Sequence, residues 1–450
     1  MTLRRFGVVF SLLFSLLLNG QASAQVHEYK LRNGLKLLIK EDHRAPVVVA
    51  QIWYKVGSSY EHNGITGVSH VLEHMMFKGS EKFEPGEFSK IIAANGGRDN
   101  AFTAKDYTAY FQQLEASRLA ISFEMEADRM RNLTLPLEEF KKEVEVVMEE
   151  RRMRTEDKPR SKTYEQFYAA AFTSNPYGQP IVGWMNDLKN MQVDDLQNWY
   201  EKWYAPNNAT LVVVGDVNPK EVYKLAQRHY GNLKPSYNIK PLKPRQEPKQ
   251  NGPRYVKVKA PARLPYVLMG YKVPVIKTAE QEWEPYALEV LSGVLSSGAS
   301  SRFDKKLLRE KQIVAQASSG YSLYARQSEL FVLDATPAAG KTVQQVIDAI
   351  KDELELLKTT SVSQQELDRI KAQVVASKVY EKDSLFYQAM QLGTLETVGL
   401  GWQRMDEYAD KVRAVTAEQV MQVAKKYFIE NSLTVAELVP VSMQQAKKNH

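Results

Sequence analysis

Residues 67–79 read Gly-Val-Ser-His-Val-Leu-Glu-His-Met-Met-Phe-Lys-Gly. On a helix, His70 and His74 project from one face because they are four residues apart, so both imidazoles can reach one metal ion. Glu73 lies on the same side, where its carboxylate can take a proton from a water. Two imidazoles, a neighbouring carboxylate and an open metal position are the parts of a zinc hydrolase.

The histidine pair stands alone in the sequence. The chain has seven His in 450 residues, and no other two have the spacing of ligands on a helix. The alternative is a surface helix that carries two histidines without a metal. The chain has no Cys, so any metal ligands are His or carboxylate side chains. That donor set favours zinc over clusters that need thiolate, and we predict one Zn²⁺ per chain.

The N-terminus has the pattern of a secretory signal. Arg4 and Arg5 precede an apolar run from Phe6 to Leu18, and Ala22-Ser23-Ala24 follows. A charged start, a short apolar core and small residues predict cleavage after Ala24. The run is short for a membrane span, and no Cys follows it to carry a lipid. We therefore expect an exported protein, periplasmic or secreted, with no stable membrane anchor.

A proline- and lysine-rich stretch divides the remaining chain into two nearly equal parts. Prolines are dense between 233 and 265, which excludes a long helix there and predicts an extended connector. The net charge is +7, but too few aromatic side chains accompany these lysines to indicate nucleic-acid binding. The predicted segments are a signal peptide (1–24), an N-terminal zinc-binding domain (25–232), a linker (233–254), a C-terminal domain (255–442) and a tail (443–450).

The two parts end in similar sequences. Residues 193–196 lead through an aromatic pair and an Asn to the apolar run 210–214, and residues 417–420 lead in the same way to 434–435. Each copy has the pattern of an amphipathic helix followed by a strand, at a constant offset of 224 residues. The repeat predicts two copies of one α+β domain.

Hydrophobic periodicity predicts the main elements. In the first part we expect a hairpin over 29–40, a strand over 47–56, a helix over 66–78 that Gly79 ends, a strand over 101–114 and a charged helix over 137–155. In the second part, 335–342 superficially matches a phosphate-binding loop, but Ala335 replaces the first Gly and Pro337 interrupts it. We instead expect Thr342 to start a helix.

A catalytic zinc needs a third protein ligand, and the charged helix over 137–155 supplies acids. Glu143 and Glu150 are seven residues apart and share a face with Val146 and Val147, so we expect that face to turn inward. Buried carboxylates need a partner, and a metal ion would serve. Helix geometry alone leaves the choice between the neighbouring acids Glu149 and Glu150 open.

Residues 67–79 closely resemble the inverted-zincin motif of the pitrilysin/insulinase metallopeptidases, a family that includes the mitochondrial processing peptidase and bacterial two-domain members. The resemblance implies two homologous α/β-roll domains, each a mixed sheet packed on helices, joined by the linker. It also implies that Glu150 is the third zinc ligand beside His70 and His74. Glu143 is then a supporting acid of the catalytic site, and Glu73 the residue that activates water.

Two further segments resemble family landmarks. Residues 96–103 and 106–110 are similar to the family's substrate-binding edge strand, which implies that Asn100, Ala101 and Phe102 contact substrate. An exposed strand edge binds an extended peptide by adding it to the sheet. The alternative is an ordinary paired strand.

The second half departs from the family pattern at one position. Residues 300–302 and 308–311 resemble the segment that supplies an Arg and, seven residues later, a Tyr. The resemblance implies that Arg309 orients substrate or stabilises the developing charge, but position 316 is Gln. Tyr321 and Tyr324 have the wrong spacing to replace the missing Tyr. The active form is then expected to be a heterodimer with a zinc-less paralogue, and the alternative is a homodimer, which would not supply a Tyr.

These observations predict an exported zinc-dependent endopeptidase that hydrolyses unfolded peptides in a cleft between two domains. The alternative is a weakly active or non-catalytic peptide-binding subunit that needs a partner to supply the Arg/Tyr pair. A zinc hydrolase acting on non-peptide bonds has no supporting feature in the sequence.

Overall fold

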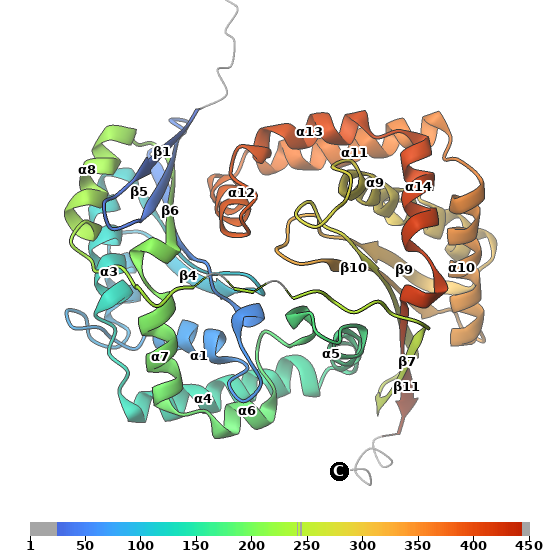
Figure 1. Ribbon diagram of the computed structural model, residues 1–450, viewed down its shortest axis with the longest axis horizontal. Helices are drawn as coiled ribbons and strands as arrows, with labels where there is room; N and C mark the ends of the chain where they lie inside the picture. The colour runs from blue at the N-terminus through green and yellow to red at the C-terminus, as the bar shows by residue number, and fades with distance from the viewer. Residues whose placement is uncertain (1–24, 241, 244, 443–450) are drawn as a thin grey trace, which may run out of the picture.

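Two mixed β-sheets with the same strand order form the frame of the protein (Figure 1). The computed structural model describes residues 25–240, 242–243 and 245–442. The expected signal peptide and the tail over 443–450 lie outside the described residues. The first sheet has the order β1-β2-β6-β3-β5-β4, and the second has the order β7-β11-β8-β10-β9. In each sheet the last strand in sequence lies parallel to one neighbour and antiparallel to the other.

The first sheet and its helices come from the N-terminal half. The strands are β1 (Val26–Lys30), β2 (Lys36–Glu41), β3 (Val47–Tyr54), β4 (Arg98–Thr103), β5 (Thr108–Glu115) and β6 (Ala209–Gly215). The helices are α1 (Val68–Met75), α2 (Glu87–Ala94), α3 (Leu119–Arg131), α4 (Leu137–Arg151), α6 (Met185–Asn190), α7 (Val193–Trp203) and α8 (Pro219–Tyr230). Apolar side chains from one face of this sheet and from these helices form the largest core cluster.

The second sheet repeats the arrangement. Its strands are β7 (Arg254–Pro261), β8 (Tyr266–Val273), β9 (Val314–Gly320), β10 (Glu329–Pro337) and β11 (Leu433–Val441). Its helices are α9 (Glu284–Ser296), α10 (Val343–Thr359), α11 (Gln364–Glu381), α13 (Arg404–Ala414) and α14 (Ala417–Tyr427). Thr342 caps α10 as expected, since its hydroxyl accepts the backbone N–H of Gln345.

The structure confirms the predicted repeat and the α+β fold class. Helices α7 and α14 begin at residues 193 and 417, and strands β6 and β11 begin at 209 and 433. Both pairs keep the offset seen in the sequence. The fold therefore consists of two copies of one topology, with β1 as an additional strand on the first sheet.

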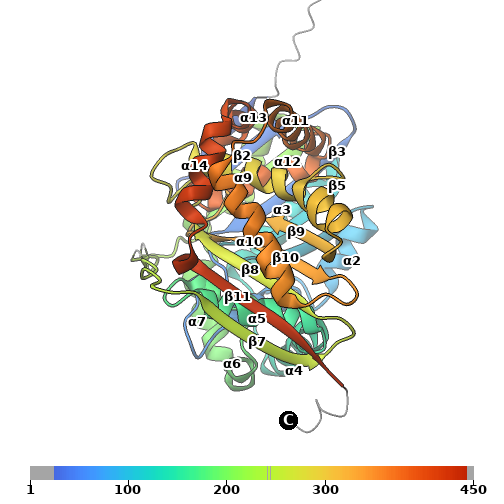
Figure 2. The same ribbon diagram turned by 90° about the vertical axis from the view of Figure 1, so that its right-hand side faces the viewer.

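Each half of the chain contributes one helix that packs on the sheet of the other half. Helix α5 (Pro159–Ala171) packs on β7, β8 and β11, whereas α12 (Leu385–Thr397) packs on β3 and β6 (Figures 1 and 2). At both contacts an aromatic ring meets a glycine. A Cβ on Gly270 would come within 2.4 Å of the Phe167 ring, and one on Gly393 within 2.0 Å of the Trp53 ring. Only glycine allows these helices to approach the sheets so closely.

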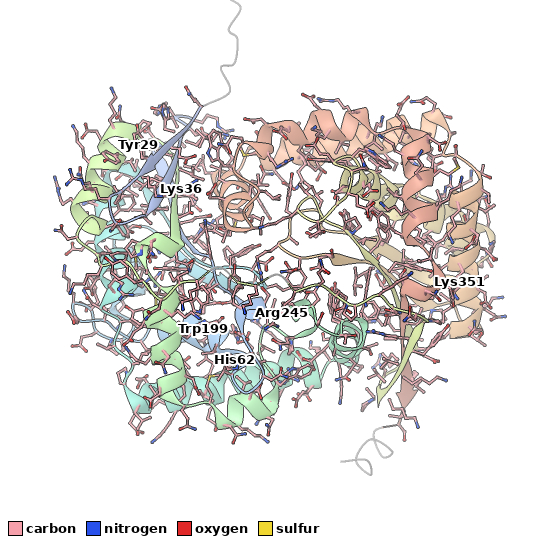
Figure 3. The ribbon with its side chains drawn as sticks, viewed as in Figure 1. Tyr29, Lys36, His62, Trp199, Arg245 and Lys351 are labelled. Carbon is pink, nitrogen blue, oxygen red and sulfur yellow. The ribbon has the colours of Figure 1, made fainter. Side chains whose placement is uncertain are left out.

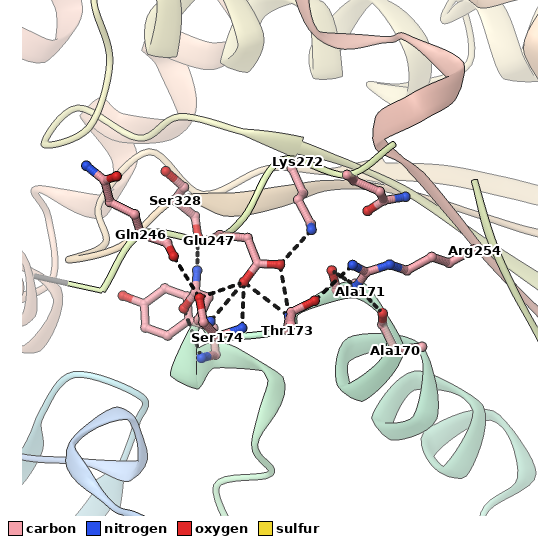
Figure 4. A network of polar contacts seen from close by, with 12 residues as sticks. Ala170, Ala171, Thr173, Ser174, Gln246, Glu247, Arg254, Lys272 and Ser328 are labelled. Atoms are coloured by element: carbon pink, nitrogen blue, oxygen red, sulfur yellow. Dashed lines mark hydrogen bonds and ion pairs between the residues drawn. The ribbon is translucent and has the colours of Figure 1, made fainter. Parts of the chain in front are cut away.

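Polar contacts tie the halves together as well. The ammonium of Lys36, labelled in Figure 3, lies 2.7 Å from the carboxylate of Glu396 on α12. The connector between α8 and β7 holds a second cluster (Figure 4). There Glu247 accepts backbone N–H groups from residues 173–175 and pairs with Lys272 on β8 at 2.7 Å.

Three element predictions need correction. The single strand expected over 101–114 is two strands, β4 and β5, because residues 104–107 form the turn of a hairpin. Helix α1 ends at Met75, and Gly79 lies beyond it in a turn with φ of 109° rather than ending the helix. Helix α4 ends at Arg151 and continues as a π-helical turn, Arg152–Glu156. No helix in the described residues has the length and apolar character needed to cross a membrane.

Candidate active site

Helix α1, which carries both histidines, is fixed at its first turn by a buried carboxylate. Glu61 accepts the backbone N–H groups of Gly67 and Ser69 at 2.7 and 2.9 Å. These donors have no partner within a helix, so the carboxylate caps them. Burial raises the pKa of Glu61 to about 7, against the opposing effect of these hydrogen bonds. Gly67 has φ of 90°, and a Cβ there would lie 2.6 Å from the carbonyl oxygen of Val182.

His70, His74 and Glu150 converge as a group that could hold a metal ion, with their ligand atoms within 4.8 Å of one another. The Nε2 atoms of His70 and His74 lie 3.8 and 3.5 Å from one carboxylate oxygen of Glu150. Tetrahedral zinc with bonds near 2.1 Å separates its ligand atoms by about 3.4 Å. The two distances to Glu150 are close to that separation, and two nitrogens with one oxygen are donors that zinc accepts.

Neighbouring charges orient two of the ligands. Glu143 lies 3.1 Å from Nδ1 of His74 and 2.7 Å from the ammonium of Lys78. Burial alone would lower the pKa of His74, but Glu143 and the nearby carboxylates outweigh it and raise that pKa. A carboxylate on Nδ1 fixes the tautomer that leaves Nε2 free for a metal. Arg154 lies 2.5 Å from the other carboxylate oxygen of Glu150, which leaves Oε2 facing the histidines.

His70 is the most buried of the three ligands. Burial and the charge of His74 lower the pKa of His70 to about 3, so its imidazole is neutral near pH 7. A neutral imidazole has the lone pair that a metal ligand needs. Its Nδ1 has no hydrogen-bond partner in the described part of the chain.

Glu73 points from α1 toward the edge strand β4. Its carboxylate accepts a hydrogen bond from the hydroxyl of Thr103, the last residue of β4. Burial raises the pKa of Glu73, although this hydrogen bond and His74 act in the opposite direction. A raised pKa makes a carboxylate a stronger base for a water proton.

A cavity of about 1000 Å³ opens over this group. Its lining includes the ligands, Glu73 and the predicted substrate residues Asn100, Ala101 and Phe102. Strand β4 is the edge of its sheet and pairs with β5 alone among the described strands. The other edge of β4 is thus available to an extended peptide.

Matches of the chain to protein families and to relatives agree with the geometry of this site. Residues 36–184 match the family model described as "Insulinase (Peptidase family M16)", and residues 190–374 match one described as "Peptidase M16 inactive domain". A relative from Helicobacter pylori, "Zinc protease PqqE", is 32% identical over 435 residues, which cover 94% of this chain and 95% of the relative. The chain belongs to the insulinase family of peptidases, M16. The sequence prediction of the family is confirmed.

Solved structures of other proteases share the fold. A crystal structure of a protease from Helicobacter pylori has a TM-score of 0.87 and 31% identity, covering 93% of this chain and all (100%) of that one. The periplasmic protease PqqL from Escherichia coli has a TM-score of 0.76 at 19% identity, covering 94% of this chain and 48% of that one. The second likeness concerns the fold alone.

Arg309 and Gln316 are not brought to the cavity. Arg309 is exposed at the end of a π-helical segment, where its guanidinium donates to the carbonyl of Ala299. Gln316 is exposed on β9, and neither residue is among those that line the cavity. Tyr321 donates instead to the carbonyl oxygen of Pro274, and Tyr324 packs near Tyr408. The role predicted for Arg309 stays a prediction.

Sequence reasoning missed several residues that shape the site. Lys78 follows His74 by four residues, and Arg154 follows Glu150 by four. Helical spacing could therefore have indicated that both basic side chains lie near the ligands. Glu61 and Thr103 come from other elements, and only the fold brings them to α1. Val146 is 48% exposed, so the face shared by Glu143 and Val147 turns inward without it.

Proposed function

We propose that this protein is a zinc-dependent endopeptidase that cleaves unfolded peptides bound along β4. The observation that carries the proposal is the convergence of two histidine Nε2 atoms on one oxygen of Glu150, with Glu73 beside them. The zinc-protease name of the Helicobacter relative supports the same chemistry. The cavity is large enough for an extended peptide segment, at the upper end of ordinary ligand pockets.

The residues take distinct roles in this proposal. His70, His74 and Glu150 hold the zinc, which would supply Lewis-acid activation of water and of the scissile carbonyl. Glu73 accepts the proton of the attacking water and passes it to the leaving amine. Thr103 orients the Glu73 carboxylate, and Glu143 holds the ring of His74 through Nδ1. Backbone groups of β4 at Asn100 and Ala101 align the peptide.

Matched variants of neighbouring acids test these roles. Glu73→Gln should keep about one zinc per chain and lose about 10²–10⁴-fold in turnover of a quenched fluorogenic peptide. Glu150→Gln should lose zinc, measured by mass spectrometry of the metal content. Glu149→Gln should behave as the wild type, because Glu149 is 58% exposed and pairs with Arg152. A Glu73→Gln enzyme with wild-type turnover would refute the mechanism.

A second candidate follows from Gln316. Neither Gln316 nor Arg309 is among the residues that line the cavity, and position 316 lacks the Tyr of the family pattern. We infer that it works as the zinc-bearing subunit of a heterodimer whose zinc-less paralogue supplies the Arg/Tyr pair. Purified alone it should cleave peptides poorly, and adding the paralogue should restore turnover. Full activity as a monomer contradicts this candidate.

We also propose that the protein works outside the cytoplasm, after cleavage near Ala24. The support is the sequence pattern of residues 1–24. Sequencing the N-terminus of the protein recovered from its native host tests this directly. A mature chain that starts at Met1 contradicts it.

A further inference from the structure

We propose that Arg160 binds a carboxylate of the peptide substrate, so that the cavity selects peptides with an acidic group near the scissile bond. This inference rests on the proposed peptidase function and deepens it. It concerns a part of the cavity wall to which the zinc ligands, Glu73 and β4 do not contribute.

Four basic side chains line the cavity, and three of them already have a carboxylate partner. Lys105 lies 2.9 Å from Glu329, Arg151 lies 2.7 Å from Glu165, and Arg154 lies 2.5 Å from Glu150. Arg160 is the fourth. No carboxylate lies within ion-pair distance of its guanidinium in residues 25–240, 242–243 and 245–442. Its charge is therefore the one in the cavity lining that remains available to a ligand.

The second half of the chain holds Arg160 in place. Nη2 of Arg160 donates to the hydroxyl of Thr336 on β10 at 2.8 Å. The guanidinium also stacks over the ring of Tyr266 on β8, 4.8 Å from the ring centroid. Thr336 and Tyr266 are both buried, so these two contacts fix the position of the guanidinium plane. The guanidinium has five N–H donors, and Arg160 lines the cavity.

The chemistry of this wall favours a carboxylate. A planar guanidinium held by an aromatic ring presents paired N–H groups, which match the two oxygens of a carboxylate. Asp334 on β10 accepts a hydrogen bond from Ser318 and interacts with Tyr266. The tyrosines at 164, 168 and 266 line the same wall and add apolar surface around the charge. A basic peptide side chain would meet repulsion there, whereas an acidic one would gain a charge-assisted pair.

The carboxylate can come from a Glu or Asp side chain or from the peptide C-terminus, and one peptide series separates the two. Each fluorogenic peptide carries Glu or Gln at one position on either side of the scissile bond and ends in a free carboxylate or an amide. We expect the wild type to prefer one acidic form by about tenfold in kcat/KM, as a charge-assisted hydrogen bond suggests. A Glu preference indicates a side chain, and a loss on amidation indicates the terminus.

Variants of α5 assign the preference to Arg160. Arg160→Gln should abolish it while leaving cleavage of the neutral peptide within about twofold, and Arg160→Glu should favour a Lys-containing peptide. Lys162→Gln removes an equal charge two residues away on the same helix, outside the cavity lining, and should keep the preference. A wild type without any carboxylate preference, or a preference that survives in Arg160→Gln, overturns the proposal.

A binding measurement separates this inference from the peptidase proposal. Fluorescence anisotropy of the same peptides with the zinc-loaded Glu73→Gln protein reads affinity without appreciable turnover. Arg160→Gln in that background should reduce the affinity for the preferred acidic peptide by about tenfold and leave its neutral twin unchanged. If the protein proves unable to cleave peptides, this difference still tests Arg160. Equal affinities for acidic and neutral peptides would contradict the carboxylate site.

Discussion

Glu247 in the connector is expected to stabilise the junction of the two halves, and its replacement by Gln tests how much. The carboxylate accepts the backbone N–H groups of Thr173, Ser174 and Asn175 at 2.8–3.1 Å and pairs with Lys272 (Figure 4). It therefore joins a loop of the first half to a strand of the second. Gln keeps one acceptor oxygen but loses the negative charge.

The pKa of Glu247 gives the magnitude. Burial of the carboxyl tends to raise its pKa, but Lys272 and the three amides outweigh burial and lower it from 4.5 to about 2. A shift of that size corresponds to about 3 kcal/mol, since one pKa unit is worth about 1.4 kcal/mol. Thr173 at the rim of the cluster is exposed, so water screens part of the interaction. We therefore expect Glu247→Gln to destabilise this junction by about 2 kcal/mol at pH 7.

The sign of the pH dependence follows from the lowered pKa. The stabilisation by ionised Glu247 is fully present above pH 4.5 and is lost as the pH falls through about 2. The difference between wild type and Glu247→Gln should thus be constant from pH 7 to 5 and shrink below 4.5. Denaturant unfolding, followed by tryptophan fluorescence on metal-free protein, measures this difference.

Hydrogen exchange gives the local readout. The amides of residues 173–175 donate to Glu247, so Glu247→Gln should reduce their protection by about 30-fold, the equivalent of about 2 kcal/mol. Glu221→Gln is the control, because Glu221 is 69% exposed and has a single ion pair with Lys224. Unchanged protection at 173–175, or a stability difference that does not shrink in acid, would refute the reasoning.

Two further predictions follow, one from a contact at the zinc site and one from the packing of α12 on the first sheet. Glu143→Gln should weaken zinc binding by about 10–100-fold in chelator competition, because the ring of His74 loses its charged partner; equal affinity would contradict that role. Gly393→Ala should destabilise the protein by about 1–3 kcal/mol in thermal unfolding, since the added Cβ meets the Trp53 ring. Gly252→Ala has open space and should change little, so equal effects of the two would count against the packing argument.

The sequence predicts the parts of the site that lie within one helix or at a repeated spacing. His70 and His74 share a face by helical geometry, and the family resemblance selects Glu150 where geometry left Glu149 open. The structure brings Glu150 to the histidines, whereas Glu149 is 58% exposed. The repeat at an offset of 224 residues also predicts the second domain, because a helix and a strand at the same spacing can pack on each other in the same way.

Sequence patterns did not predict the contacts between segments that are far apart in the chain. Residues 101–114 are rich in Phe, Tyr and Thr, and this richness hid the turn at 104–107 although Lys105 and Asp106 are poor strand formers. Asp106 is buried there and binds Arg326 of the other half, a partner that no local spacing reveals. The packing of α5 and α12 on the sheet of the opposite half was likewise not predicted, since the sequence of a helix does not indicate which sheet it covers.

The packing of α12 on the first sheet has a consequence for synthesis of the chain. The face of the first sheet that carries Trp53 and Val212 is covered by Ala389 and Leu392 of α12, near the far end of the sequence. As the polypeptide emerges from N- to C-terminus, this apolar face stays uncovered until α12 has been made. The first half therefore cannot bury this face of its sheet during translation until α12 has been made.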